Sequence, residues 1–553
     1  MSLDRGPVPG TETRMQGLRI LTLLLSLAMG LRAAEQLSQT DVERIFAQAV
    51  TYAAQADPRA VISVVDREGF VLGVWSVQAG AVPSAGVIAG AVSRAGTAAF
   101  LSSNQDAFTS RTAGFIIQQH FPPGVRGTPP GPLVGVGFSN LFYSDVNRFK
   151  AIPPGFNPLD LSPTKDAPGD PQTGKISTGV RGGAVALTSL NDSPGGVPLY
   201  KNGELVGGLG VTGDGSPTDL SAAAAIIANQ VQNNSTPGFK AGRDTDEEVA
   251  LAGQTGFRPG DDILASNVLI NGIRIPYVDP KPGDIPKARN TRPLGSIGAV
   301  VPGYKIQGSP APFPYPKATL NGVDGEIRNP IRSDPLPGKV NGRANRLSAG
   351  EVQEILGLAA KRCAETRAGI RLPLGTRAKV FISVVNNPHQ NGVAPQVLGC
   401  FRVGEATLFS WDVCVQKART AVFFSNVQLA DSCRTVGFLS ERYFPPGIDG
   451  QPWGPYFGFQ EAVSLKTSPV AHTFPGNPNL PNGLTIFPGG FPLYRDGELV
   501  GAIGVSGDGV DQDDIISASG CANFLPLDRI RADNYLYRGV RLPYAKFPRD
   551  PSE

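Results

Sequence analysis

An arginine followed by a threonine occurs at matching positions in two similar segments of the chain. The pairs are Arg111-Thr112 and Arg434-Thr435, and each lies about two helical turns before a Phe-Pro-Pro-Gly sequence. A guanidinium can bind a carboxylate through two parallel hydrogen bonds, and a neighbouring hydroxyl can line the same pocket. An anion-binding site is therefore one interpretation, and a salt bridge on the helix beside a packed hydroxyl is the other.

The residue directly before Phe-Pro-Pro-Gly differs between the two segments. It is His120 in the first and Tyr443 in the second. Imidazole and phenolate are both known axial ligands of haem iron, so the exchange would keep the capacity to bind a metal while changing its electronics. Alternatively, both rings pack at the end of a helix, where a histidine also interacts favourably with the helix dipole.

Glycines recur at matching positions in a sequence typical of a β-hairpin. Gly207 and Gly210 correspond to Gly501 and Gly504. They lie within a strand rather than between a parallel strand and a helix, which argues against a nucleotide-binding loop. Glycines in a strand permit the close approach of another backbone or of a flat ligand, so close packing and a ligand wall are both consistent with the pattern.

Other signals for catalysis are weak. The three histidines have no metal-binding spacing and no G-x-S-x-G sequence occurs, so zinc and serine hydrolases fit poorly. The recurring acidic residues lack EF-hand spacing and favour a helix start over a calcium loop. The five cysteines include no C-x-x-C-H sequence, which excludes covalently attached c-type haem, and their odd number leaves at least one thiol unpaired.

These matching positions belong to an internal repeat. Residues 93–124 align without gaps to residues 416–447, with 15 of 32 positions identical. Residues 195–215 align in the same way to residues 489–509, with 15 of 21 identical. Similarity at this level in the same order predicts two diverged copies of one domain.

The two copies are predicted at 36–280 and 346–546, joined by a Pro- and Gly-rich linker at 281–345. Each begins with an amphipathic helix behind a capping signal, followed by two strands, two helices and a hairpin with an Asn-Gly or Asp-Gly turn. A final helix is expected near Asp219 and Asp513. Hairpin connections imply antiparallel sheets packed with helices, so the predicted fold class is α+β. We expect the copies to pack as a pair through a closed, self-complementary interface.

Composition and charge exclude several partners. Lys and Arg number 50 and Asp and Glu 47, so the net charge of +3 provides no field to attract nucleic acid.

An apolar run at 20–31, preceded by Arg14 and Arg19 and followed by small residues, predicts a signal peptide over 1–34. The run is too short for a standard membrane span. We therefore expect a periplasmic or secreted protein without an integral membrane span.

This order of elements, together with V-V-D-x-x-G at 64–69, resembles the GlcG/HbpS family of haem-degrading-domain proteins. The most specific part is G-G-x-P-L-x-x-x-G-x-x-V-G-x-x-G-V-x-G-x-x-x-x-x-D, which occurs at 195–219 and 489–513. The resemblance covers most of the secondary structure of each copy, but not the loops at about 125–194 and 229–256. It implies two profilin-like domains in tandem, compact homo-oligomers, and binding of haem or a related tetrapyrrole as cofactor.

The resemblance also suggests roles for the repeated residues. The arginines would hold a haem propionate, the glycines would border the ligand, and at least His120 would contact the iron. The predicted ligand-binding set is Arg111, Thr112, His120, Gly207, Gly210, Arg434, Thr435, Tyr443, Gly501 and Gly504, with His120 and Tyr443 as candidate iron ligands.

Three functions follow from these observations. The leading hypothesis is an exported, non-catalytic haem- or tetrapyrrole-binding protein used in haem handling or redox sensing. The second is a haem-dependent or small-acid oxidoreductase in which bound iron does the chemistry. The third is a non-catalytic accessory module whose long loops bind another protein, for example a sensor or an enzyme.

Overall fold

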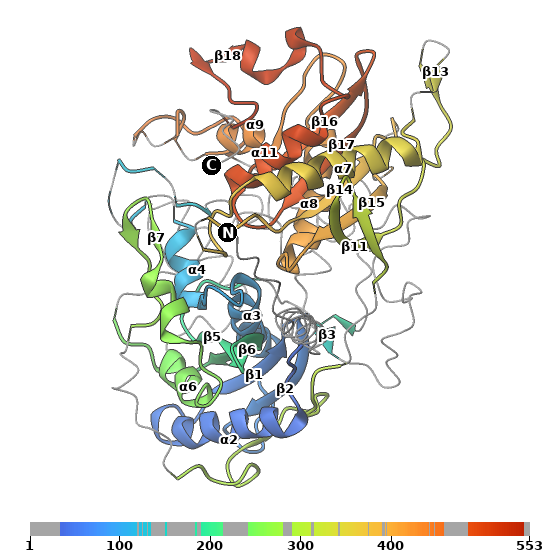
Figure 1. The fold of residues 1–553 in the computed structure, drawn as a ribbon. Coiled ribbons are helices and arrows are strands. Elements are labelled where there is room, and N and C mark those ends of the chain that lie inside the picture. Colours follow the sequence, from blue (N-terminus) through green and yellow to red (C-terminus); the bar gives the residue numbers. More distant parts are fainter. Residues whose placement is uncertain are drawn as a thin grey trace, which may run out of the picture.

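The computed structural model describes residues 34–546, with long gaps at 134–149, 152–182, 185–189, 214–241, 280–289 and 458–484 and gaps of one to four residues elsewhere. The signal peptide predicted over 1–34 therefore lies almost entirely outside the described residues. Each half of the chain forms a sheet packed with helices, coloured blue to green for the first half and yellow to red for the second (Figure 1).

The first half follows the predicted order of elements up to the hairpin. Its elements are α2 (Gln39–Ala56), β1 (Val61–Asp66), β2 (Phe70–Ser76), α3 (Ala85–Leu101), α4 (Ser110–Ile116), β3 (Lys150–Ala151), β4 (Gly183–Ala184), β5 (Gly196–Lys201), β6 (Glu204–Thr212), α6 (Thr245–Gly253), β7 (Leu269–Ile270) and β8 (Ile273–Arg274). Ser38 caps α2 and forms a reciprocal capping box with Asp41, as its sequence predicts.

The second half repeats this order, except that its described residues include no counterparts of β3 and β4. Its elements are α7 (Ala349–Glu365), β14 (Phe381–Asn386), β15 (Val397–Val403), α8 (Phe409–Phe423), α9 (Cys433–Leu439), β16 (Gly490–Arg495), β17 (Glu498–Ser506), α11 (Val510–Gly520), β18 (Leu536–Tyr537) and β19 (Val540–Arg541). Short 3₁₀ turns precede the last hairpin of each half, at Asp261–Ile263, Ala265–Asn267, Asp528–Ile530 and Ala532–Asn534.

The two sheets share one topology. The first contains the order β2-β1-β6-β5 and the second the order β15-β14-β17-β16, with antiparallel pairing throughout these strands. The registers also agree, since Ile62 pairs with Val211 and Ile382 with Val505. The predicted combination of helices with antiparallel sheets is therefore confirmed.

Helices cover both faces of the first sheet. Successive residues of a strand point to opposite faces, and Val61 and Val65 of β1 join the core that contains α3. Ile62 and Val64 join a separate core with α2 and α6. The core around α3 continues into the second half of the chain, so the halves share buried apolar surface.

The segment predicted as a linker contributes strands to both sheets. Its strand β9 (Ala299–Val300) pairs with β2, and the hairpin of β10 (Lys317–Leu320) and β11 (Val323–Asn329) pairs with β15. A further short pair, β12 (Lys339–Val340) and β13 (Arg343–Ala344), follows. Residues 281–345 are thus partly integrated into the two sheets instead of only tethering them.

The final helix of each half carries a buried acidic residue. In the second half α11 includes Asp513, as predicted, and this carboxylate pairs with Lys417 at 2.7 Å. The position near Asp219 lies outside the described residues. In the first half Asp246 of α6 pairs with Arg94, also at 2.7 Å. Because Arg94 aligns with Lys417, Asp246 is the structural counterpart of Asp513.

The repeated hairpin glycines allow close packing. A Cβ on Gly210 would collide with the carbonyl oxygen of Ala91 in α3, and one on Gly504 with that of Cys414 in α8. Gly207 and Gly501 lie equally close to backbone carbonyls of the neighbouring strands β1 and β14. Of the two interpretations of these glycines, the structure favours helix and strand packing over a ligand wall.

The halves meet through unlike surfaces. Arg371, in the loop after α7, donates a hydrogen bond of 3.0 Å to the carbonyl of Ser102, and Ser103 Oγ donates to the carbonyl of Arg371 at 2.7 Å. Ser102 and Ser103 follow the C-terminal end of α3. Thr407, just before α8, donates to the carbonyl of Phe100. The end of one central helix therefore meets the start of the other.

This head-to-tail arrangement corrects the expectation of a self-complementary interface. In a twofold pair, the end of α8 would contact the start of α3 in return. Instead Phe423, at the end of α8, is 51% exposed, while the aligned Phe100 is 2% exposed. An ion pair of 2.8 Å between Arg67 and Glu405 lies on the same one-way junction.

Candidate ligand-binding site

A cavity of about 740 Å³ lies where the two halves meet. The first half contributes Gly131 and Pro132 and the β7–β8 turn, and the second half contributes most of the remaining lining. The full lining is Gly131, Pro132, Leu269, Ile270, Asn271, Arg367, Gly369, Ile370, Arg434, Gly437, Phe438, Glu441, Pro446, Ile486, Phe487, Pro488, Gly509, Val510, Asp511, Gln512 and Pro543.

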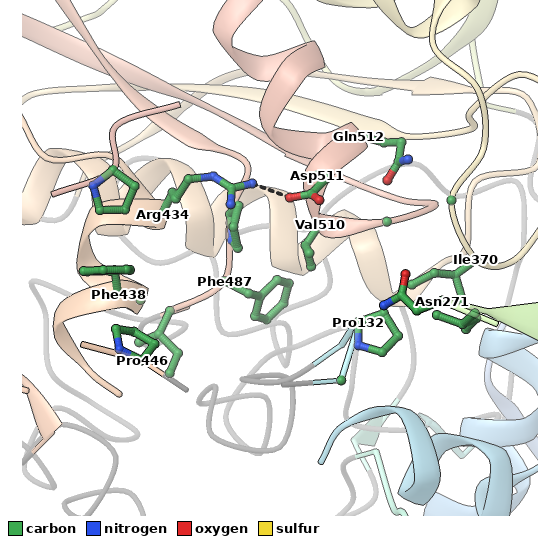
Figure 2. Close-up of a pocket in the computed structure, with 18 of the residues that line it drawn as sticks. Pro132, Asn271, Ile370, Arg434, Phe438, Pro446, Phe487, Val510, Asp511 and Gln512 are labelled. Carbon is green, nitrogen blue, oxygen red and sulfur yellow. Dashed lines mark hydrogen bonds and ion pairs between the residues drawn. The ribbon is translucent and has the colours of Figure 1, made fainter. Parts of the chain in front are cut away.

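Arg434 of α9 is held at one side of the cavity by two carboxylates. Its Nη2 lies 2.6 Å from Asp511 Oδ1 and its Nε 2.8 Å from Asp514 Oδ2, and 20% of its side chain is exposed. Figure 2 shows the bond to Asp511 at the start of α11. Lys546 Nζ approaches the same Asp511 at 3.0 Å. Burial would raise the pKa of Asp511, but Arg434 and Lys546 lower it below its usual value, so this carboxylate is ionised.

A second guanidinium in the lining has no such partner. Arg367 is half-buried in the loop after α7, and no ion pair of its side chain occurs among the described residues. The charged side chains of the lining are those of Arg367, Arg434, Asp511 and Glu441, and Arg434 is paired with Asp511. Arg367 is therefore the lining cation best placed to bind an anionic group of a ligand.

Glu441 supplies a carboxyl group of different character. It follows α9, is half-buried, and burial raises its pKa to about 7. No hydrogen bond or ion pair of its side chain occurs within the described residues. Near neutral pH this group can therefore either donate a proton in a hydrogen bond or carry a negative charge.

The remaining wall is apolar. Ile370, Ile486 and Phe487 are buried, and Phe438 and Val510 adjoin them. Figure 2 places the Phe487 ring between Arg434 and Pro132 in that view. The ammonium of Lys417 lies 4.7 Å from the centre of the Phe487 ring, which holds the ring by a cation–π contact. The cavity thus combines an apolar wall with the guanidinium groups of Arg367 and Arg434.

The corresponding arginine of the first half belongs to a buried ion pair. Arg111, the counterpart of Arg434, makes hydrogen bonds of 2.8 and 2.9 Å to the two oxygens of Glu247, and both side chains are buried. Asn191 and Thr485 make the same backbone bond to the aligned threonines Thr97 and Thr420, at 2.7 and 3.0 Å.

The matching bonds of Asn191 and Thr485 show which residues of the first half correspond to the apolar wall of the second. Asp192 and Ser193 of the first half take the places of Ile486 and Phe487. The second half therefore has the apolar wall that the first half lacks.

The structure separates the predicted site residues into groups. Arg434 lines the cavity. Arg111 forms the salt bridge that was the alternative interpretation, but the pair with Glu247 is buried instead of lying on the helix surface. Thr112 and Thr435 donate to the carbonyls of Pro276 and Pro543 at 2.7 and 2.6 Å and take part in helix capping. These threonines therefore fix the last hairpin of each half instead of lining the cavity.

The two candidate iron ligands differ in their placement. His120 lies outside the described residues. Tyr443 is half-buried two residues beyond Glu441 and does not line the cavity. The role of both as iron ligands stays a prediction.

Sequence reasoning missed Glu441, Phe487 and Arg367. Glu441 aligns with Gln118, and this change from amide to acid inside the repeated block was a usable signal. Phe487 lies just outside the aligned hairpin block, and Arg367 lies in a loop that the first half lacks. Neither had a matching position to draw attention to it.

Within the described residues, no group of three or more histidine, cysteine, aspartate or glutamate side chains is arranged to hold a metal ion. In that same part of the chain, no helix combines the length and apolar character needed to cross a membrane. All five cysteines are buried free thiols.

Comparison with known proteins identifies a family match in the second half. Residues 353–522, from α7 to just beyond α11, match the family described as haem degrading protein HbpS-like. Most residues of the cavity lining fall within this range. No curated protein matches the chain.

Two solved structures are similar to part of the chain. One is described as a crystal structure of a PduOC:heme complex, with 22% identity, a TM-score of 0.22, and coverage of 32% of this chain and 93% of that one. The other is the Klebsiella pneumoniae protein ORFY of family DUF336, with 20% identity, a TM-score of 0.22, and coverage of 34% and 94%.

Proposed function

We propose that this protein binds a haem-type tetrapyrrole in the cavity between its halves and serves in haem handling or redox sensing. The observation that carries the proposal is that one cavity of about 740 Å³ combines an apolar wall with two guanidinium groups, of which that of Arg367 has no ion pair among the described residues. Small-molecule and cofactor sites typically measure roughly 300–1,000 Å³. The match of residues 353–522 to a haem-degrading family supports the same ligand class.

The lining suits the two chemical parts of such a ligand. A porphyrin is a flat apolar ring with carboxylates along one edge. Phe487, Ile486 and Ile370 would contact the ring, while Arg367 and Arg434 would bind the carboxylates through charge-assisted hydrogen bonds. Arg367 is the more important of the two because Arg434 already pairs with Asp511 and Asp514.

The described lining suits the ring better than the metal. It contains no histidine, cysteine, methionine or tyrosine, and Glu441 is its one carboxyl oxygen donor outside an ion pair. Bound haem would supply redox chemistry at its iron. The residues present would hold it mainly by its ring and carboxylates, so iron-free protoporphyrin should bind about as tightly as haemin.

Absorption titration of the full chain with haemin and with protoporphyrin tests this proposal. Saturable binding of both is expected. Arg367→Gln should weaken both about tenfold, the loss of one charge-assisted hydrogen bond of ~1.4 kcal/mol. Arg377→Gln is a matched control, because Arg377 is exposed on the same loop and outside the lining. Absence of saturable binding for both ligands would reject the proposal.

We further propose that both halves are profilin-like members of this family and that the protein is exported. The shared strand order, the equivalent ion pairs and the aligned blocks support a common origin. The order of basic, apolar and small residues over 1–34 supports export. Mass spectrometry of the mature protein tests export, since an intact Met1 or Met15 would contradict it.

A further inference from the structure

Two of the five buried cysteines lie side by side in the second half. Cys400 is in β15 and Cys414 is in α8, and neither side chain is exposed. Burial and a side-chain hydrogen bond between the two thiols raise the pKa of Cys400 well above its usual value. The other three thiols donate to backbone carbonyls instead, those of Ala378, Lys417 and Ser517.

The strand register brings the two sulfur atoms together. Cys400 pairs with Ser383 of β14, which pairs in turn with Gly504 of β17, so these three residues form one row across the sheet. Because Gly504 has no side chain, the backbone of α8 can approach this row closely, and a Cβ at this position would collide with the carbonyl oxygen of Cys414. A disulfide requires such a close approach of the two residues that it joins.

The start of α8 is held over the other side of the same row. The indole nitrogen of Trp411 donates to Asn329 Oδ1 at 3.1 Å, and Asn329 pairs with Cys400 across β11 and β15. Cys414 lies nearly one helical turn after Trp411, and its thiol donates to the Trp411 carbonyl at 2.9 Å. The helix is therefore fixed to the sheet on either side of Cys400.

The matching positions of the first half both lack cysteine. Val74 occupies the place of Cys400, because it has the equivalent serine as its strand partner. Ala91 occupies the place of Cys414, because both carbonyls lie against the equivalent hairpin glycine. A valine and an alanine thus fill this place in the first half, so packing alone requires no sulfur. Two positions that are adjacent in space carry cysteine together in one half, as expected where the side chains act as a pair.

We propose that Cys400 and Cys414 form a disulfide that joins β15 to α8 when the chain folds in the presence of a low-molecular-weight disulfide such as oxidised glutathione. The structure shows the pair in its reduced form. One protein thiolate attacks oxidised glutathione, which releases one glutathione thiol and leaves a mixed disulfide. The second cysteine then attacks the mixed disulfide. One protein S–S bond replaces two S–H bonds, and two reduced glutathione molecules carry away the two electrons and two protons.

Burial determines when this bond can form. Neither sulfur is accessible in the folded chain, and thiol exchange requires access. The exchange therefore takes place before α8 packs on the sheet, and the finished disulfide is shielded from reductants. The bond closes a loop over residues 400–414, which restricts the unfolded chain and so stabilises the fold. It also fixes the helix that carries Lys417, the residue that holds Phe487 in the cavity wall.

Refolding the full chain from denaturant in a glutathione redox buffer tests the proposal. Titration of thiols in denaturant should find two fewer than the five of the reduced chain. Trypsin cleaves after Lys379, Arg402 and Lys417, so mass spectrometry should find peptides 380–402 and 403–417 joined to each other. The oxidised chain should unfold at a temperature roughly 6–12 °C above that of the same chain kept in reductant.

A double variant and a matched control complete the test. Cys400→Val with Cys414→Ala introduces the residues of the first half and should abolish both the joined peptides and the difference in unfolding temperature. Cys363→Ala is the control, because Cys363 is an equally buried thiol whose aligned residue in the first half is Ala53, and it should keep both. The peptide analysis uses the wild type, so it decides the question even if the double variant fails to fold. Five free thiols after refolding, glutathione adducts in place of joined peptides, or a disulfide between any other two cysteines would overturn the proposal.

Discussion

Lys417 makes the same two contacts in the second half that Arg94 makes in the first. Each cation binds a carboxylate of the last helix at 2.7 Å, Asp513 for Lys417 and Asp246 for Arg94. Each also donates to a strand carbonyl, that of Val505 or Val211. Arg94 uses only Nη1 for both bonds, and its buried Nε has no partner. A single nitrogen is therefore sufficient at this position to bind both the carboxylate and the strand carbonyl.

The first prediction follows from the use of a single nitrogen of Arg94 for both bonds. Asp246→Ala should lower the free energy of unfolding by about 3–5 kcal/mol, because it leaves the Arg94 charge buried and unpaired. Arg94→Lys should change it by less than ~1 kcal/mol, since the second half already uses lysine. Urea denaturation followed by circular dichroism measures both. Equal losses for the two variants would contradict this account.

The second prediction concerns Asp431, a buried residue whose Oδ1 has no hydrogen-bond partner. Burial raises its pKa to about 7, so the folded protein holds a proton that the unfolded chain releases from about pH 4 upward. Stability should therefore fall as pH rises from about 4 to 7. Asp431→Asn should remove this fall and unfold at a higher temperature than the wild type at pH 8, but not at pH 4. The aligned residue in the first half is the apolar Phe108, which shows that the position requires no charge.

Asp533 provides the control with the opposite sign. Burial would raise its pKa, but Arg531 lowers it below the usual value, so its contribution to stability is present at neutral pH and is lost as pH falls. Asp533→Asn should therefore destabilise the protein at pH 8. If Asp431→Asn and Asp533→Asn changed the stability at pH 8 in the same direction, the environments assigned to these two carboxyl groups would be wrong.

The third prediction links Glu441 to ligand charge. As pH rises from 6 to 8, Glu441 loses its proton and repels a carboxylate ligand in the cavity. Protoporphyrin should bind more weakly at pH 8 than at pH 6, and Glu441→Gln should remove most of that difference. Arg367→Gln should bind more weakly at both pH values and keep the dependence. Fluorescence titration at the two pH values separates these effects.

The fourth prediction concerns close packing of α8 on β17. Gly504→Ala would place a methyl group against the carbonyl of Cys414 and should destabilise the protein by at least ~1–3 kcal/mol. Gly350→Ala is the matched control, because that glycine is exposed in α7 and a Cβ there meets no atom closer than 4.0 Å. It should stabilise the protein by up to about 1 kcal/mol through helix propensity. Thermal unfolding distinguishes the two directions.

Local sequence signals predicted the elements well because each depends on neighbouring residues. Ser348 and Glu351 form the expected capping box at α7, and the Asp496-Gly497 turn joins β16 to β17. The helix expected near Asp219 of the first half lies outside the described residues and stays a prediction. The aligned block ends at Gly215, and α6, which carries the counterpart of Asp513, begins only at Thr245.

The cavity could not be predicted in the same way because it depends on how the halves meet. Arg434 was found through its repeat, but Asn271, which lines the same cavity, comes from the other half and Arg367 from an unmatched loop. The assumption of twofold packing would have placed the β7–β8 turn elsewhere. Only the one-way junction brings Asn271 and Arg434 to the same cavity.

The loop that carries Arg371 has an evolutionary consequence. The first half joins the corresponding helix and strand by a short turn at 57–60, whereas the second half has residues 366–380 there. On the common origin proposed above for the two halves, these two equivalent regions came under different selection. Changes at Arg371 must preserve its bonds to Ser102 and Asp508, which lie in two different halves. Sequence differences between the halves should therefore be interpreted separately at each position. Differences at the junction reflect specialisation, and differences elsewhere reflect drift.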